Sequence, residues 1–310
     1  MSSASIHQEL ITAWKVQARA NPVLTIGFLS ALAALTLLIL GSLIHSYLYG
    51  NSAHFRLANY GGLAGLAGTA SGALLILFLG QVRQKVQDSL LGFAAGMMLA
   101  ASSFSLILPG IEAADVLFGS TALAALLVAV GVGIGAMLML GLDYFTPHEH
   151  ESSGPCGPEC QRISGIWLFV FAIALHNIPE GMAIGVSFAQ GDLGVGIPLT
   201  TAIALQDIPE GFAVALALRA TGLGAIKSAL IAATTGLLEP AGAVLGFAMA
   251  SSVAPAYPLS MGIAAGAMIF VVSHEVIPET HRYGHQTMAT VGLIAGFMVM
   301  MFLDTALGSL

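Results

Sequence analysis

Two copies of a short polar motif lie inside long apolar stretches of the chain. HNIPEG occupies residues 176–181, QDIPEG occupies residues 206–211, and a further acid, Glu239, precedes Pro240 in the next apolar stretch. Residues three and four apart share one face of a helix, so each copy presents a carboxylate and an imidazole or amide on the same side. Two antiparallel neighbouring helices with such faces would bring these groups to one site.

The acids of this set need a counter-charge if their helices cross a membrane. Each buried acid costs about 2.5–3.5 kcal/mol on insertion scales, and no Lys or Arg lies inside the predicted spans. Protons or bound cations therefore remain, and the neutral groups beside the acids favour a metal. The alternative is a polar network that only holds helices together. The acids are Glu180, Asp207, Glu210 and Glu239, and the neutral groups are His176, Asn177 and Gln206.

The composition agrees with a membrane location. Of 310 residues, 57% are hydrophobic and 8% charged, and the mean hydropathy is +0.90, which is far from an ordinary soluble domain. The net charge of −7 and the aromatic share of 7% exclude nucleic acid as the main partner, because no basic surface is available to hold phosphates.

Apolar runs of about 20 residues, enough to cross a bilayer, recur along the chain. They predict an all-α polytopic membrane protein, because the ten-residue alternation of membrane strands is absent from the sequence. We expect nine spans, the seventh and eighth being separated by a polar break at 251–258. The predicted stretches are 23–48, 57–82, 89–111, 116–142, 165–190, 193–218, 228–273 with its break, and 286–303.

The basic residues indicate the orientation, because short cytoplasmic loops retain Lys and Arg. With nine spans, alternate loops separate the basic residues almost completely. This predicts a cytoplasmic N-terminus and an outside C-terminus, with only Arg56 on the outer side. The cytoplasmic set is Lys15, Arg19, Arg83, Lys85, Arg162, Arg219, Lys227 and Arg282.

The chain also contains an internal repeat. Residues 91–109 and 261–279 match at an offset of 170, including Gly92 with Gly262 and Met98 with Met268. Five helices separate the two copies, so they cross the membrane in opposite directions. Inverted repeats of this kind are typical of secondary transporters.

HNIPEG followed by QDIPEG, with a glutamate-proline pair on the next helix, closely resembles the ZIP (Zrt-/Irt-like) family of divalent metal transporters, in its bacterial GufA-like branch. The resemblance implies eight core helices arranged 3+2+3 within residues 57–310, with residues 1–56 as an additional segment containing the leading helix. It also implies elevator-like uptake of Zn²⁺ across the bacterial inner membrane into the cytoplasm, and acceptance of Cd²⁺. Transport of Fe²⁺ or Mn²⁺ and a homodimer are left open, and we expect no resident cofactor.

The resemblance further implies a binuclear site in which Glu180 and Glu210 bind both ions. The first ion would be held by Met98, His176, Glu180, Gln206 and Glu210. The second would be held by Asn177, Glu180, Asp207, Glu210 and Glu239.

A series of side chains with nitrogen and oxygen ligand atoms on the cytoplasmic side of this site predicts an exit path. The polar loop 143–163 carries part of it, together with Cys156 and Cys160, and is either a flexible linker or a regulatory metal-binding segment. Deleting this loop is a direct test. The predicted path residues are His274, Glu275, His281, His285, Asp143, His148 and His150.

A rival hypothesis places a catalytic metal at the same acids. The chain would then be an intramembrane hydrolase with Glu180 or Glu210 as general base. Transport is favoured over an enzyme, because acids that supply nearly all the ligands leave little room for an activated water.

Overall fold

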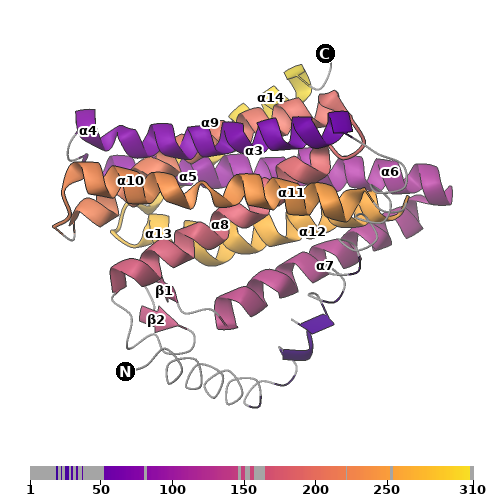
Figure 1. The fold of residues 1–310 in the computed structure, drawn as a ribbon, viewed down its shortest axis with the longest axis horizontal. Helices are drawn as coiled ribbons and strands as arrows, with labels where there is room; N and C mark the ends of the chain where they lie inside the picture. Colours follow the sequence, from indigo (N-terminus) through magenta and orange to yellow (C-terminus); the bar gives the residue numbers. More distant parts are fainter. Residues whose placement is uncertain are drawn as a thin grey trace.

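The computed structural model describes residues 52–79, 82–145, 148–150, 154–156, 165–220, 222–251 and 254–307, and a few single residues between 19 and 37. Most of the predicted leading helix, 23–48, and most of the polar loop, 143–163, therefore lie outside the described residues. Figure 1 shows the described helices, most of which run in nearly the same direction, with α7 and α8 inclined to the others.

The described chain is almost entirely helical, which confirms the all-α prediction. Its only strands are β1 (His148–His150) and β2 (Gly154–Cys156), paired antiparallel. The helices are α3 (Ser52–Leu74), α4 (Ile76–Leu79), α5 (Gln84–Ala100), the π-helix η1 (Ala101–Ile107), α6 (Leu108–Phe118), α7 (Thr121–Phe145), α8 (Gly165–Ser187), α9 (Leu193–Ala220), α10 (Ala225–Thr235), α11 (Leu238–Ala250), α12 (Ala256–Val271), the π-helix η3 (Val272–Val276), α13 (Ile277–His281) and α14 (Gln286–Leu307).

Within the described residues, seven helical stretches are long and apolar enough to cross a membrane. Several of them join two or three of the helices named above into one rod, such as Gln84–Phe118 and Ala256–His281. The 23-residue α8 lies outside this set of seven. A multi-pass membrane protein is therefore supported, while the count of eight core helices stays a prediction.

The predicted boundary between the second and third core helices is wrong. Instead of ending at 111, the helix continues through α6 to Phe118, so Val116 belongs to it and not to the next span. Gly119 ends it in the left-handed conformation, with φ +62, and its N–H donates to the Asp115 carbonyl. Glycine adopts this conformation without a Cβ clash, which makes it a frequent helix terminator. Charges at 112 and 115 had suggested an earlier end.

Glycines allow four pairs of helices to pack with their backbones in contact. A Cβ on Gly181 would lie 2.1 Å from the carbonyl oxygen of Glu239, and one on Gly242 would lie 2.5 Å from that of Ile178. Both distances are too short for any side chain at these two positions, as in the small-residue helix interfaces of membrane proteins. The pairs and their glycines are α8 with α11 (Gly181, Gly185, Gly242, Gly246), α5 with α14 (Gly92, Gly96, Gly292, Gly296), α7 with α12 (Gly131, Gly135, Gly262, Gly266) and α3 with α9 (Gly68, Gly72, Gly211).

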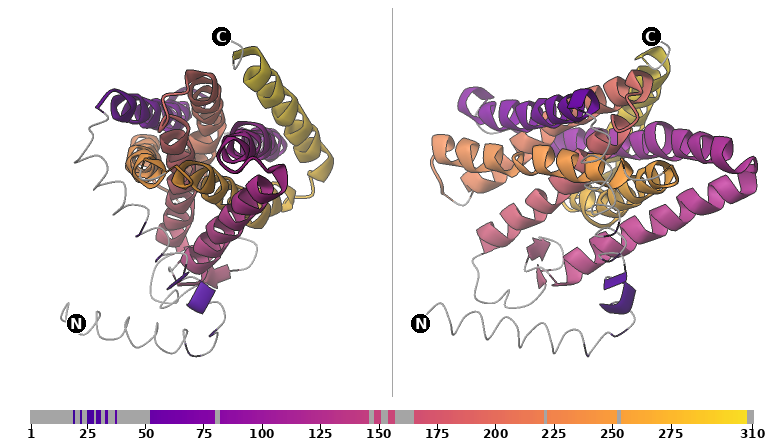
Figure 2. Two further views of the ribbon diagram at one scale, coloured as in Figure 1. Left: turned by 90° about the vertical axis from the view of Figure 1, so that its right-hand side faces the viewer. Right: turned by 45° about the vertical axis from the view of Figure 1, so that its right-hand side comes forward.

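These pairs assemble into two blocks. The site block consists of α3, α4, α8, α9, α10 and α11, and the frame block consists of α5, η1, α6, α7, α12, η3, α13 and α14. The left view of Figure 2 looks nearly along α3 and α5, while α14 extends across the view from the C-terminus. Every glycine of the described core helices, α3 to α14, that approaches another helix backbone does so within its own block. Between the blocks, α5 packs on α9 and α8 packs on α12 through buried side chains.

The internal repeat is supported by the secondary structure. Each copy contains a π-helix, η1 in one and η3 in the other, and the two overlap when shifted by 170 residues. Each π-helix is followed by a proline in the first turn of the next helix, Pro109 or Pro278. Two unrelated apolar helices would not be expected to share a rare element at the same place.

Candidate metal centre

The two motif copies lie on α8 and α9, which remain helical through Pro179 and Pro209. Each proline removes a hydrogen bond from the helix beside the carboxylates. Glu239 reaches the same region differently, because α10 ends at Thr235 and α11 begins at Leu238, which places Glu239 in its first turn. Three consecutive segments of the chain thus deliver acids to one level of the bundle.

The structure brings the acids together. One carboxylate oxygen from each of Glu180, Asp207 and Glu210 lies within 4.8 Å of the others, and all three residues are buried. The neighbouring predicted ligands are buried too, with Gln206 and Glu239 fully inaccessible. A cluster of this kind matches the oxygen-rich surroundings of a divalent cation.

His176 is oriented by a residue outside the predicted ligand set. Its Nε2 lies 2.5 Å from Oε2 of Glu275, and its Nδ1 lies 3.6 Å from Oε1 of Glu210. We assign the ring proton to Nε2, which then donates to Glu275 and leaves the lone pair of Nδ1 facing the acids. A histidine that binds a metal commonly donates its other N–H to a carboxylate in this way.

The cluster is incompletely hydrogen-bonded. Gln206 Nε2 donates to Glu180 Oε1 at 2.6 Å, and Thr69 donates to Glu239 Oε1 at 2.6 Å. Nevertheless, each of the seven predicted polar ligands has one buried side-chain atom without a partner. Buried polar atoms are rarely left so, which indicates a ligand at this place. The atoms are His176 Nδ1, Asn177 Nδ2, Glu180 Oε2, Gln206 Oε1, Asp207 Oδ2, Glu210 Oε1 and Glu239 Oε2.

All but one of these atoms are acceptors or accept in the tautomer assigned above. The exception is Asn177 Nδ2, and rotating that amide by half a turn would present its oxygen instead. Met98 of α5 is fully buried in the core that the two blocks share. Its assignment as a sulfur ligand stays a prediction.

The predicted exit residues have different partners in the structure. Glu275 contacts His176, as described, and His274 lies 3.6 Å from Asp143 across the frame block. His281 Nδ1 lies 2.8 Å from the carbonyl of Ile277 in its own helix. The side chains of His148 and His150 lie outside the described residues, although their backbones form β1 opposite β2.

His285 has a partner that the sequence did not indicate. Its Nδ1 lies 2.7 Å from Asp88 Oδ2, and Gln84 donates to the other oxygen of Asp88 at 2.8 Å. A helix that begins at 89, as the sequence predicts, would have Asp88 as its N-cap. The structure contradicts this prediction, because α5 already begins at Gln84 and Asp88 is buried inside it.

Two further polar residues were missed by the motif search. Thr69 of α3 binds Glu239, and Ser105 of η1 donates to Asp304 at 2.5 Å. The repeat offset of 170 is the signal that could have found both, since it relates Thr69 to Glu239 and Ser105 to Glu275.

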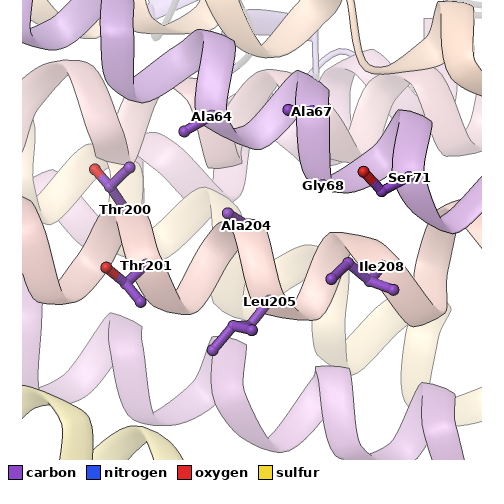
Figure 3. A pocket seen from close by; sticks show the side chains of 9 residues that line it. All are labelled: Ala64, Ala67, Gly68, Ser71, Thr200, Thr201, Ala204, Leu205 and Ile208. Atoms are coloured by element: carbon purple, nitrogen blue, oxygen red, sulfur yellow. The ribbon is translucent and has the colours of Figure 1, made fainter.

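An open groove of about 410 Å³ lies between α3 and α9, beside the acids and not among them. Figure 3 shows its walls, which consist of small residues, of Leu205 and Ile208, and of the hydroxyl-bearing Ser71, Thr200 and Thr201. None of the predicted ligands lines it. The candidate metal centre is therefore the buried cluster and not this groove.

The fold and the site define a multi-pass helical membrane protein with a buried acidic centre suited to a divalent cation. A family model described as "ZIP Zinc transporter" matches residues 146–304. Zinc transporter ZIPB of Bordetella bronchiseptica is 58% identical over 305 residues, which cover 98% of this chain and 99% of that protein. Zinc transporter GufA of Myxococcus xanthus is 41% identical, with 78% and 96% covered. Zinc transporter ZIP11 of Homo sapiens is 31% identical, with 77% and 94% covered. The chain belongs to the ZIP family.

Proposed function

We propose that the protein moves Zn²⁺ across a bacterial inner membrane into the cytoplasm through the buried acidic centre. The observation that carries this proposal is the set of unpartnered atoms, one on each predicted polar ligand. A passing cation would satisfy them, and its charge would offset the burial of four carboxylates. The relatives named as zinc transporters support the choice of ion.

The centre would hold two ions. The first lies among Met98, His176, Glu180, Gln206 and Glu210, and the second among Asn177, Glu180, Asp207, Glu210 and Glu239. The thioether makes Cd²⁺ acceptable at the first position, because sulfur suits softer ions. The second position is more oxygen-rich and harder than the first, because it has neither the thioether nor the imidazole.

The proposed orientation follows the distribution of basic residues, with the N-terminus in the cytoplasm and the C-terminus outside. Uptake toward the cytoplasm is what membership of the ZIP family implies. In this orientation Ser105 and Asp304 lie on the outer side of the centre. Glu275, His274 and Asp143 lie on the inner side and lead toward the cytoplasm. Asp88 and His285 follow nearer that surface.

Transport would occur by movement of the site block against the frame block. Reciprocal glycines bring helix backbones into contact inside each block, whereas buried side chains form the boundary between the blocks, where we expect the sliding to occur. Small residues at 94–96 and 264–266 predict a smooth wall for such a movement. Gly96 and Gly266 do not belong to it, because they face α14 and α7 of their own block. The buried alanines beside them, Ala95 and Ala265, remain candidates for the wall.

A crosslink tests this movement. Cysteines replacing Ala95 on α5 and Ala213 on α9 should crosslink in one transport state only, with the yield changed by Zn²⁺, because α5 and α9 belong to different blocks. The measurement is crosslinking yield in membranes with and without metal, extended to neighbouring positions on α9. A full crosslink across the boundary that leaves uptake unchanged would contradict block movement.

The polar loop gives a second test. Deleting 149–158 should leave the uptake rate within about twofold of wild type and change its inhibition by intracellular zinc, because none of the deleted residues belongs to the predicted ligand set. A Gly/Ser replacement of the same length is the matched control for chain connectivity. Loss of uptake in a normally inserted deletion variant would place the loop in the transport step itself.

The decisive experiment for the function is ⁶⁵Zn²⁺ uptake into liposomes that contain only this protein. Uptake above that of empty liposomes supports transport, and its absence from correctly folded protein would overturn it. The same preparation tests the rival hydrolase, since a hydrolytic enzyme would retain zinc without moving it into the lumen.

A further inference from the structure

The centre is built from two halves with matching geometry. A Cβ on Gly72 would lie 2.0 Å from the carbonyl oxygen of Ile208, and one on Gly242 would lie 2.5 Å from that of Ile178. The repeat offset of 170 takes Gly72 to Gly242, and the motif offset of 30 takes Ile178 to Ile208. The contact of α3 with α9 is therefore repeated in the contact of α11 with α8.

The same relation pairs Thr69 with Glu239. A Cβ on Gly211 would lie 2.2 Å from the Thr69 carbonyl oxygen, and one on Gly181 would lie 2.1 Å from the Glu239 carbonyl oxygen. Gly181 and Gly211 end the two motif copies. Thr69 thus occupies in one half the place that Glu239 takes in the other, so one half contributes a carboxylate and the other a hydroxyl.

The two side chains contact each other. Thr69 is buried, and its Oγ1 donates to Oε1 of Glu239 at 2.6 Å, while Oε2 has no partner. Gly65 provides the room for that free oxygen. A Cβ at Gly65 would lie 1.7 Å from Glu239 Oε2 and 3.4 Å from Asp207 Oδ2. The bond to Thr69 therefore leaves one oxygen of Glu239 available beside Asp207.

We propose that Thr69 is a positioning residue that makes Glu239 a one-oxygen ligand and thereby sets the ion-size preference of the second metal position. This inference rests on the proposed function. A carboxylate with both oxygens free can bind in a bidentate manner, as is common around larger cations that take six or more ligands. A carboxylate with one oxygen occupied suits the smaller coordination number of Zn²⁺.

The test compares Zn²⁺ and Cd²⁺ uptake, supplied together, in liposomes containing the full chain. Thr69→Val keeps the shape of the side chain and removes the hydroxyl, so the Cd²⁺/Zn²⁺ uptake ratio should rise roughly threefold or more, the effect of losing about one hydrogen bond. Thr69→Ser keeps the donor and should retain the wild-type ratio. Thr235→Val is the matched control, because Thr235 is equally buried and its hydroxyl bonds to Ala232 in its own helix.

A second comparison tests whether Thr69 affects the uptake ratio through Glu239. In a Glu239→Ala background, Thr69→Val should produce no further change in the ratio, whereas a merely structural effect would persist. The proposal is overturned if Thr69→Val keeps the wild-type ratio, or if its effect is the same with and without Glu239. Thr69→Ala serves as a second hydroxyl-free variant. If neither folds while Thr235→Val does, the hydroxyl serves folding and the proposal is also overturned.

Failure of the proposed function would look different. Wild-type protein would then move neither metal, and the inference would be decided by competition of Zn²⁺ and Cd²⁺ for binding to the detergent-solubilised protein. In this binding experiment too, Thr69→Val should shift the preference toward Cd²⁺, while Thr69→Ser should behave as wild type. If the wild type transports both ions but Thr69→Val does not alter the ratio, only the inference about Thr69 fails.

Discussion

Glu180→Ala and Glu210→Ala should each reduce zinc uptake into liposomes by at least about a hundredfold. Both carboxylates lie in the cluster with Asp207, and both belong to each proposed ion position. Loss of an outer partner of a ligand already costs about 10–100-fold in metal affinity, so loss of a shared ligand should cost more. His176→Ala should also abolish uptake, because its Nδ1 lies 3.6 Å from Oε1 of Glu210 in the cluster.

The same variants should remain well folded. Removing a carboxylate from the apolar interior relieves about 2.5–3.5 kcal/mol of insertion cost, so metal-free Tm should stay at or above that of wild type. Zinc should raise the Tm of wild type and not of the variants, because only a bound ligand stabilises by mass action. Glu112→Ala, which removes an exposed acid of α6, is the control. Wild-type uptake by both glutamate variants would exclude this centre as the transport site.

Gly246→Leu should lower the free energy of unfolding by about 3 kcal/mol or more and sharply reduce the yield of folded protein. A Cβ at Gly246 would lie 2.1 Å from the carbonyl oxygen of Met182 on α8. Neither backbone can yield without separating α8 from α11, and overpacking of this kind is strongly destabilising. Thermal unfolding followed by size-exclusion chromatography in detergent measures the effect.

Gly133→Leu is the matched control, because a Cβ at Gly133 has no atom within 4 Å. This substitution should change stability by less than about 0.5 kcal/mol, as is usual for positions without close neighbours. Equal behaviour of the two leucine variants would mean that the close helix pairs do not hold the site block together.

The helical nature of the chain and the composition of the centre were predictable from local signals. Long charge-free runs leave helices as the only simple way to satisfy backbone groups in a bilayer. Acids at helical spacing beside proline, repeated after 30 residues, identified residues on α8, α9 and α11 that the structure places in one buried region. Their metal-binding role stays a prediction that the uptake experiments address.

Boundaries and partners were less predictable. The end of α6 was placed too early because charged residues near a helix end and inside a helix look alike in a sequence. The pairing of Asp88 with His285 was not predictable either, since the two residues are 197 positions apart in the chain. A hydrogen bond between distant helices leaves no local pattern.

By itself, the sequence determined the helices and the position of the acids along them, because hydrophobicity and helical period are properties of neighbouring residues. It also determined the inverted repeat, because two similar segments of one chain can be aligned directly. Only the tertiary structure decided which acids share a cluster, that Glu275 orients His176, that Thr69 holds Glu239, and how the helices divide into two blocks. These depend on which helix faces meet. In this protein that choice is made by glycines packed against carbonyl groups far away in the chain, whose partners appear only when the backbones are in contact.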